Sequence, residues 1–185
     1  MNHTATSEDE LLAASLKLAS EEGLKSLNIR SIARACGVSV GCVYRYFPSK
    51  AELVSAAVGK IWEQIFHMAE NAGAQGDFRG AVRWVFSCIR SGCAEYPSFF
   101  RQHAGAFAES EKGEGRRAME RCLGHIRAVL LRALEEDPSV RAGVFDRSFT
   151  REDFVSFVFD NLISLGVRQA DSCEFLLRLI EKLIF

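Results

Sequence analysis

Apolar side chains recur every three or four positions along most of this 185-residue chain, the spacing of helices that bury one face. Capping residues and glycine or proline breaks divide the pattern into segments. The segments that we expect to be helical are 8–22, 29–36, 40–46, 50–71, 78–94, 97–109, 115–136, 151–169 and 172–185. No segment has the alternation of a β-strand, so the pattern predicts an all-α fold of about nine helices.

The boundaries of the first helices are the clearest. Side chains able to cap a helix N-terminus precede each of the first four: Ser7, Asn28, Ser39 and Ser49. Gly37 separates the second helix from the third, and Pro48 ends the third. Two short helices joined by a glycine turn form a helix-turn-helix, a DNA-binding motif. We therefore expect a helix-turn-helix domain over residues 1–50 and a larger helical domain over residues 51–185.

The last two expected helices are apolar on nearly all sides, so they must be buried on more than one side. One side can face the domain core, and the other predicts a partner, most simply a second copy of the chain. The residues that we assign to this dimer interface are Phe154, Phe157, Val158, Leu162, Leu176, Leu179, Ile180 and Leu183. The alternative is a deeply buried helix pair within a monomer.

The charge distribution adds a second signal. The chain has a net charge of −1, which argues against diffuse binding to polyanions. The stretch from Lys25 to Lys50 nevertheless holds five Lys or Arg residues and no Asp or Glu. Such a local concentration of positive charge is typical of a nucleic-acid contact.

The side chains of the third helix that face outward are expected to be Val40, Cys42, Tyr44 and Arg45. Arg45 is suited to reading guanine through two hydrogen bonds. Gly41 has no side chain, so DNA could approach its backbone closely. The hydroxyls of Tyr44 and Tyr46 suit phosphate oxygens, although either ring could instead pack within the domain. Lys50 lies in the first turn of the next helix, whose N-terminus favours a phosphate.

This segment resembles the TetR family of bacterial transcriptional regulators. The matching residues are Ile32-Ala33, Ala35, Gly37-Val38-Ser39, Gly41, Val43-Tyr44, Tyr46-Phe47 and Ser49-Lys50. The resemblance covers about residues 8–56 at motif level and is architectural beyond them. By position it implies DNA contacts from Ser39, Gly41, Cys42, Tyr44, Tyr46 and Lys50. Asn28 stands where Thr is common in the family and can both cap its helix and contact phosphate, whereas Cys42 replaces a common Thr or Ser and lacks a strong hydroxyl donor.

The resemblance also implies an Ω-shaped homodimer whose small domains bind a palindromic double-stranded operator. In the family, the larger domain dimerises through its last two helices and senses a small molecule. We therefore expect a ligand-responsive regulator, a repressor that a hydrophobic or amphipathic effector releases from DNA. The alternative is a helical protein-interaction module whose helix-turn-helix is only structural, which the acid-free basic stretch disfavours.

An effector pocket between helices needs apolar walls and a few polar anchors. The residues that we assign to it are Trp62, Phe66, Phe86, Phe100, His103 and Phe107. Among them Phe100, His103 and Phe107 are three and four positions apart and share one helix face. Packing in an ordinary core is the alternative for each aromatic ring.

Other functional classes find little support in the sequence. There is no catalytic motif and no close spacing of the four histidines, so we expect no enzyme activity, metal or cofactor. The six cysteines contain no Cys-x-x-Cys and are expected to be free thiols, with redox sensing through Cys88 and Cys93 as the alternative. No signal peptide and no apolar run of membrane-spanning length are found, so a cytoplasmic location is expected.

Overall fold

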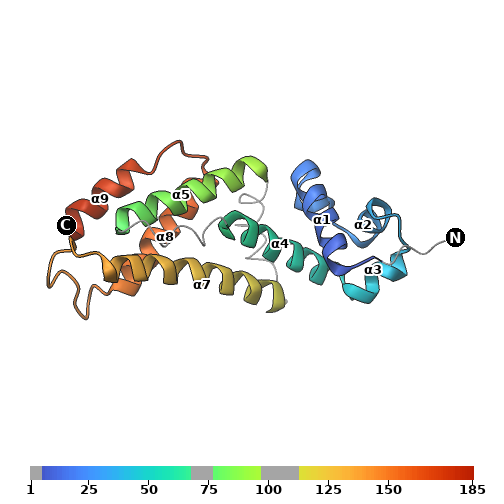
Figure 1. Cartoon of the computed structure of the whole chain (residues 1–185), viewed down its shortest axis with the longest axis horizontal. Helices are drawn as coiled ribbons and strands as arrows, with labels where there is room; N and C mark the ends of the chain where they lie inside the picture. Colours follow the sequence, from blue (N-terminus) through green and yellow to red (C-terminus); the bar gives the residue numbers. More distant parts are fainter. Residues whose placement is uncertain (1–5, 68–76, 97–112) are drawn as a thin grey trace. The chain divides into compact units, whose positions relative to one another are not determined.

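The computed structural model of the chain describes residues 6–67, 77–96 and 113–185. Within these ranges it forms eight α-helices, one 3-10 helix and no strand (Figure 1). In chain order these are α1 (Glu8–Glu22), η1 (Leu24–Ser26), α2 (Ile29–Ala35), α3 (Val40–Tyr46), α4 (Lys50–His67), α5 (Phe78–Glu95), α7 (Gly113–Glu136), α8 (Arg151–Val167) and α9 (Glu174–Ile184). The predicted all-α class is confirmed. The helix expected over residues 97–109 lies outside the described residues.

Most boundaries follow the predicted caps, but the last three helices differ. The pattern predicts α7 from residue 115, yet the helix begins at Gly113. The pattern predicts α8 to residue 169, yet the helix ends at Val167, and Gln169 takes a left-handed conformation with φ of 53°. The pattern predicts α9 from residue 172, yet the helix begins at Glu174. The N-cap residue is Cys173, whose side chain makes no capping hydrogen bond, and the Ser172 hydroxyl accepts a hydrogen bond from the Glu174 N–H at 3.0 Å.

The chain divides into two compact units. The first takes in residues 1–64 and 94–122, and the second takes in residues 65–93 and 123–185. The boundaries fall within α4, α5 and α7, so the first unit contains most of α4 in addition to the helix-turn-helix. The division of function at residue 50 stays a prediction.

In the first unit, α1, α2 and α3 follow one another closely (Figure 1). The Ser7 hydroxyl accepts a hydrogen bond from the Glu10 N–H at 3.2 Å, and the Glu10 carboxylate accepts one from the Ser7 N–H at 3.1 Å. This reciprocal capping box fixes the start of α1. The fully buried apolar side chains of this unit include one from each of its first four α-helices, Leu11, Ile32, Val43 and Leu53, together with Leu27, which follows η1.

The turn between α2 and α3 is a Schellman motif, which explains the glycine at its centre. The Val38 N–H donates to the Ala33 carbonyl at 2.9 Å, and the Gly37 N–H donates to the Arg34 carbonyl at 3.2 Å. Gly37 has a φ of 66°, a left-handed conformation that a side chain would strain. The predicted glycine turn is thus present, and it determines how α3 leaves α2.

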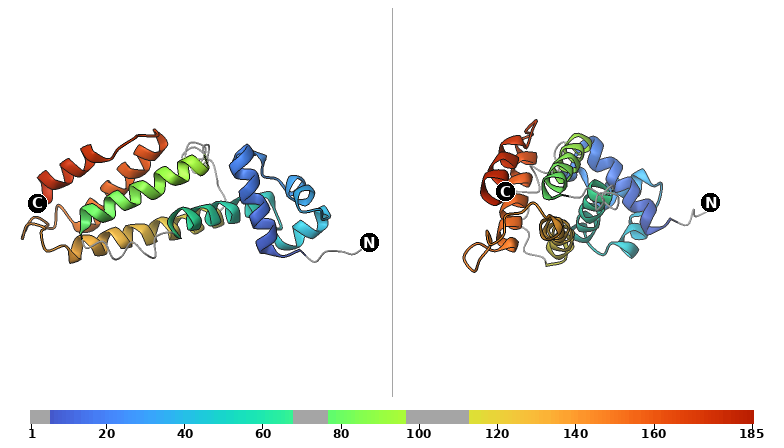
Figure 2. Two further views of the ribbon diagram at one scale, coloured as in Figure 1. Left: turned by 45° about the horizontal axis from the view of Figure 1, so that its top comes forward. Right: turned by 60° about the vertical axis from the view of Figure 1, so that its left-hand side comes forward.

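In the second unit, α5 lies beside α8 and α9 (Figure 2). Gly166 of α8 faces Ile89 of α5 so closely that a Cβ on the glycine would overlap the Ile89 side chain. Arg83 and Arg79 of α5 pair with Glu174 and Glu181 of α9, at 3.5 Å and 3.6 Å. Close apolar packing therefore joins α5 to α8, and ion pairs at the surface border its contact with α9.

The segment between α7 and α8 is a long loop, as predicted, and it packs through aromatic rings. Phe145 and Phe149 stack with their centroids 5.2 Å apart, and both rings contact Phe154 of α8. Arg141 in the same loop donates hydrogen bonds to the last carbonyls of α9, from its side chain to Leu183 and from its backbone to Ile184, both at 2.8 Å. A cation at a helix C-terminus also interacts favourably with the helix dipole.

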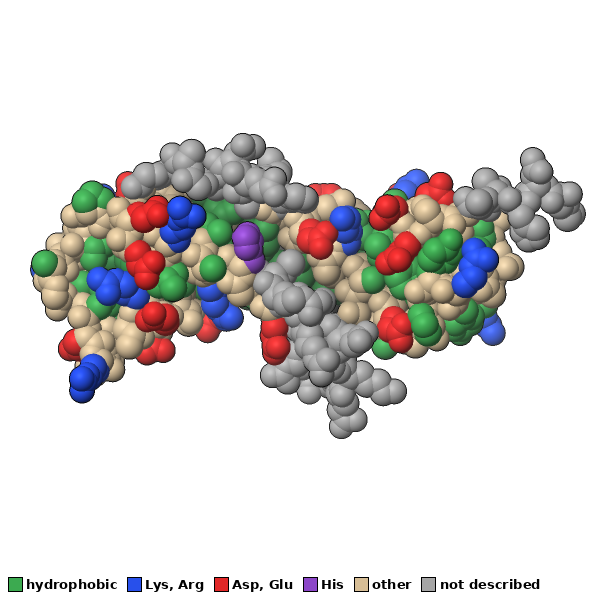
Figure 3. Space-filling view, turned by 60° about the horizontal axis from the view of Figure 1, so that its bottom comes forward, with side chains coloured by type: hydrophobic (Ala, Val, Ile, Leu, Met, Phe, Trp, Pro, Cys, Tyr) green, Lys and Arg blue, Asp and Glu red, His purple; other side chains and the backbone are tan. Residues whose placement is uncertain are grey.

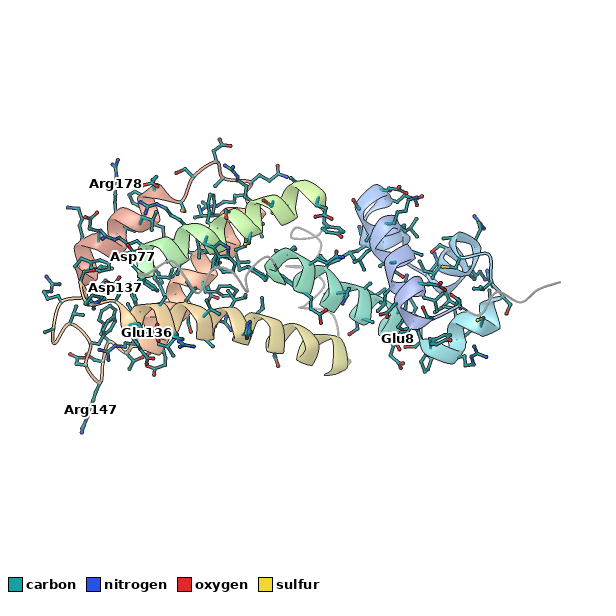
Figure 4. All side chains as sticks on the ribbon, in the orientation of Figure 1. Glu8, Asp77, Glu136, Asp137, Arg147 and Arg178 are labelled. Atoms are coloured by element: carbon teal, nitrogen blue, oxygen red, sulfur yellow. The ribbon has the colours of Figure 1, made fainter. Side chains whose placement is uncertain are left out.

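Asp137 joins the end of α7 to the start of α5. Its side chain is only 5% exposed, and its carboxylate accepts hydrogen bonds from the backbone N–H groups of Phe78 at 2.9 Å and Ser139 at 3.0 Å. Asp77 accepts a further one from the Gly80 N–H. Figure 4 shows Asp77 and Asp137 near one another at the start of α5. Two carboxylates therefore satisfy N–H groups that the helix itself leaves without partners.

Burial alone would raise the pKa of Asp137, but hydrogen bonds from Ser139 and Phe78, together with the charge of Arg79, hold the pKa below its ordinary value. The ionised carboxylate therefore stabilises the folded state at pH values above the ordinary pKa of about 4. This stabilisation is lost as the pH falls through the lowered pKa.

We predict that Asp137→Asn lowers the free energy of unfolding by about 1–3 kcal/mol at neutral pH, because buried N–H groups lose a charged acceptor. Chemical denaturation of both proteins at neutral pH and near pH 3 measures the effect, and the difference should shrink at the lower pH. Asp171→Asn, the same change at an exposed carboxylate, is the control and should have little effect. An equal difference at both pH values would contradict the assigned role of the charge.

Candidate nucleic-acid interface

The orientation of α3 is set by its buried side. Val43 is fully buried and Phe47, just after the helix, is 3% exposed. The Ser39 hydroxyl caps the helix by accepting a hydrogen bond from the Cys42 N–H at 3.2 Å. The opposite side, which we call the outward face of α3, consists of Val40, Gly41, Tyr44 and Arg45, all exposed. The predicted outward residues therefore point to solvent, except Cys42, which is half-buried.

Gly41 stands on this face without a structural need for glycine. A Cβ built there would meet only the Ser39 hydroxyl, at 3.9 Å, which is ordinary contact. Its φ lies outside the left-handed region, unlike that of Gly37. The fold therefore has room for a side chain at Gly41.

The basic side chains of the segment are available to a ligand. Lys25, Arg30, Arg34, Arg45 and Lys50 are all exposed. In the part of the chain that the structure describes, none of the five forms an ion pair with a carboxylate. Elsewhere charges of both signs are interspersed, as Figure 3 shows for one face of the second unit, on the left of the view. The segment therefore presents five exposed cations that form no ion pair with any carboxylate of the described residues.

The two tyrosines of α3 differ in what their hydroxyls do. Tyr44 is 49% exposed, and no described group hydrogen-bonds to its hydroxyl. Tyr46 is half-buried, and its hydroxyl donates to the backbone carbonyl of Thr6 at 2.6 Å. Sequence reasoning missed Thr6, because nothing in a local pattern indicates a contact across 40 residues. The structure thus leaves the Tyr44 proton available to a phosphate and engages the Tyr46 proton within the protein.

The side chain of Asn28 is used mainly as a cap. Its Oδ1 accepts from the Ser31 N–H at 2.9 Å, and its Nδ2 donates to the Ser26 carbonyl at 3.0 Å. Ser31 returns the contact by accepting from the Asn28 N–H. The predicted cap at Asn28 is confirmed, and one amide hydrogen is left for any contact with DNA. Lys50 is the first residue of α4 and is exposed.

A family model described as "Bacterial regulatory proteins, tetR family" matches residues 11–57, from α1 into α4. The match includes the glycine turn and the whole outward face of α3. The helix-turn-helix segment of the chain is thus of the TetR family type. Over 66 residues it is 38% identical to the HTH-type transcriptional repressor KstR of Mycolicibacterium smegmatis, covering 36% of this chain and 32% of KstR. The aligned part is thus about a third of that relative.

The fold of the chain is similar to solved structures over nearly its whole length. A transcriptional regulator from Rhodococcus sp. Rha1 aligns with a TM-score of 0.67 at 22% identity, covering 92% of this chain and 87% of that one. The structure of BioQ with its natural double-stranded DNA operator aligns with a TM-score of 0.62 at 18% identity, covering 96% and 97%. At such identities the likeness concerns the fold alone.

The residues assigned to a dimer interface divide into two groups. Five are buried within the second unit, where they belong to its own core: Phe154, Val158, Leu162, Leu176 and Ile180. The other three are exposed: Phe157, Leu179 and Leu183. The structure adds Phe175, which is 76% exposed and four residues before Leu179 on α9. Only the exposed group can meet a partner without rearrangement of the core.

The residues assigned to an effector pocket are only partly described. Trp62, Phe66 and Phe86 are buried. Phe100, His103 and Phe107 lie outside the described residues. The assignment of these six residues to one pocket therefore stays a prediction.

The cysteines fit packing better than redox chemistry. Burial raises the pKa of Cys93 to about 11 and also raises the pKa of Cys88, so both are protonated thiols at neutral pH and poor nucleophiles. The Cys93 thiol donates to the Gly166 carbonyl at 3.5 Å. The described residues contain no His, Cys, Asp or Glu group able to hold a metal ion, and none of their helices is long and apolar enough to cross a membrane.

We predict that Gly41→Ala separates folding from DNA binding. Alanine should raise the free energy of unfolding by about 0.5–1 kcal/mol, because it is the better helix former and the fold has room for it. The same methyl group should weaken binding to operator DNA by about 1–3 kcal/mol if it is forced into a close contact. Thermal denaturation and a DNA titration measure the two effects.

Gly124→Ala is the matched control, because Gly124 lies in α7 with open space where its Cβ would be. It should gain stability in the same way and leave DNA binding unchanged. If Gly41→Ala binds the operator with unchanged affinity, then DNA does not approach the backbone closely at Gly41.

Proposed function

We propose that this chain is a DNA-binding transcriptional regulator, a repressor that grips operator DNA with the outward face of α3 and the first turn of α4. The observation that carries the proposal is the outward face itself, where Tyr44 and Arg45 project beside the bare backbone of Gly41. A major groove accepts a helix with such a face. The exposed cations around it supply phosphate contacts.

The relatives support this reading. KstR is named a transcriptional repressor, and BioQ has been solved with its double-stranded DNA operator. The match to the family model covers residues 11–57, the segment that carries the outward face of α3. Arg45 is the side chain best suited to read a base, while Tyr44, Ser39 and Lys50 are suited to phosphates.

We further propose that the chain acts as a homodimer on a palindromic operator. Phe175, Leu179 and Leu183 are spaced by four residues along α9 and are 76%, 36% and 46% exposed, and Phe157 of α8 is 51% exposed. An apolar stripe of this kind favours burial against a partner. A two-fold dimer would present two copies of α3 to two half-sites of DNA.

The same proposal includes release from DNA by a hydrophobic or amphipathic small molecule. In the second unit, Phe66 and Phe86 are buried aromatic residues, a type that commonly lines apolar ligand pockets. Binding can shift the chain between two arrangements only if the effector has a higher affinity for the one that does not bind DNA. A thermal-shift screen followed by operator release tests this part separately from DNA binding.

The alternative is a helical interaction module in which the helix-turn-helix is only structural. Such a module has no need of five exposed cations without neutralising carboxylates. A gel shift with the DNA upstream of the protein's own gene distinguishes the two. Failure to bind any DNA sequence selectively at low salt would sink the proposed function.

We predict that Lys50→Ala weakens binding to all DNA sequences alike, because a phosphate contact carries no base information. Each lost contact should reduce the slope of log affinity against log salt by about 0.9. Arg45→Ala should instead cost about 1–3 kcal/mol on the operator and relax the preference at one base position. Titrations of operator and unrelated duplexes over a salt series measure both, and an unchanged base preference in Arg45→Ala would rule out its reading role.

We predict that Leu179→Glu disrupts the dimer by at least about 3 kcal/mol, because two leucines leave the interface and two carboxylates enter it. Sedimentation velocity across a concentration series measures the change. Ala128→Glu, at an exposed position of α7, is the control with the same added charge. A Leu179→Glu protein that sediments like the unmodified chain would place the dimer interface elsewhere.

A further inference from the structure

Tyr46 lies next to the proposed base-reading arginine but uses its hydroxyl inside the protein. The hydroxyl donates to the Thr6 carbonyl at 2.6 Å and accepts from Arg45 Nη2 at 3.5 Å. A tyrosine hydroxyl has one proton and two lone pairs, so both contacts can form together. The hydroxyl proton is then donated to the Thr6 carbonyl, so Tyr46 has no proton left to donate to a phosphate oxygen.

The acceptor that holds Tyr46 is itself fixed. Thr6 is 8% exposed, and its hydroxyl donates to the Glu10 carboxylate at 3.0 Å. The same carboxylate oxygen accepts the Ser7 N–H in the capping box of α1. The Thr6 carbonyl therefore has a defined position relative to α1, and it transmits that position to Tyr46 on α3.

The Arg45 side chain contacts Tyr46. Its guanidinium carbon lies 5.3 Å from the centroid of the Tyr46 ring, within the range of a cation–π interaction. The Arg45 side chain is otherwise exposed, and a long exposed side chain loses much rotamer freedom when it binds. Contacts that restrict it beforehand reduce that loss.

We propose that Tyr46 is a positioning residue for Arg45, fixed in turn by the N-terminal cap of α1 through Thr6. This inference rests on the proposed function, because it takes Arg45 to be the side chain that reads a base. It assigns Tyr46 a different role from Tyr44. Tyr44 contacts a phosphate and adds affinity for any sequence, whereas Tyr46 acts through Arg45 and adds discrimination between sequences.

The two roles separate in a pair of matched variants, Tyr46→Phe and Tyr44→Phe, each of which removes one hydroxyl and keeps the ring. The probes are a duplex that the unmodified protein selects from a random-sequence library and a scrambled duplex of the same length. Fluorescence anisotropy at fixed salt gives the affinity for each. Tyr46→Phe should lose roughly fivefold in affinity for the selected duplex and little for the scrambled one, as expected for one hydrogen bond. Tyr44→Phe should lose affinity for both duplexes alike.

The decisive measurement repeats Tyr46→Phe in an Arg45→Ala background. If Tyr46 acts through Arg45, the second change should produce no further loss of discrimination, so the two effects are not additive. Equal losses on both duplexes in both backgrounds would show a direct phosphate contact and overturn the proposal. Unchanged binding by Tyr46→Phe, or an Arg45→Ala protein with full discrimination, would overturn it as well.

Melting temperatures of all variants control for folding. If Tyr46→Phe does not fold, Glu10→Ala tests the same network from its far side, because it frees Thr6 without touching α3. That variant should also lose affinity for the selected duplex more than for the scrambled one, and parallel losses would overturn the proposal. An unmodified protein that selects no sequence contradicts the proposed function itself, a result distinct from any of these.

Discussion

The candidate DNA-contact surface depends on the burial of Val43 and Phe47. A helix of seven residues such as α3 has no stability of its own, because so few hydrogen bonds cannot offset the cost of nucleation. It exists because two apolar side chains four positions apart are removed from water on one side. Once that side is fixed, geometry dictates the opposite side, and Gly41, Tyr44 and Arg45 face solvent. The burial of Val43 and Phe47 thus determines which side chains form the surface proposed to bind DNA.

Local hydrogen bonds then determine where this short helix begins and how its side chains are held. The Schellman turn at Gly37 sets its departure from α2, and the Ser39 hydroxyl satisfies an N–H group at its start. At its other end Tyr46 connects α3 to the cap of α1, with Arg45 resting against the ring. Among the described residues, no carboxylate forms an ion pair with the exposed cations of this segment, so their charge is available to phosphates. Position and charge are therefore supplied by different residues, which makes their contributions separable by mutation.

In the second unit, the packing of α5, α8 and α9 determines which sides of the apolar helices α8 and α9 remain exposed. Gly166 admits α8 close to Ile89 of α5, and Arg141 fixes the C-terminal end of α9 by binding its last carbonyls. Asp137 caps α5 from the end of α7. With α5, α8 and α9 held in this way, Leu176 and Ile180 of α9 turn inward, and Phe175, Leu179 and Leu183 remain outside. The apolar stripe proposed for dimerisation therefore consists of the side chains that this packing leaves exposed.

The sequence by itself determined the helices, their caps and the glycine turn, because these arise from contacts between residues three to five positions apart. It also determined the basic segment and the match of residues 11–57 to the TetR family, because both depend only on the order of residues. Only the tertiary structure decided which of the eight proposed interface residues are exposed, since α8 and α9 are apolar nearly all round and their periodicity does not mark the inner side. It likewise decided that Tyr46 donates to Thr6 and that Asp137 caps α5, contacts between residues 40 and 59 positions apart. Such pairings depend on how helices pack against one another, and a local pattern carries no record of that.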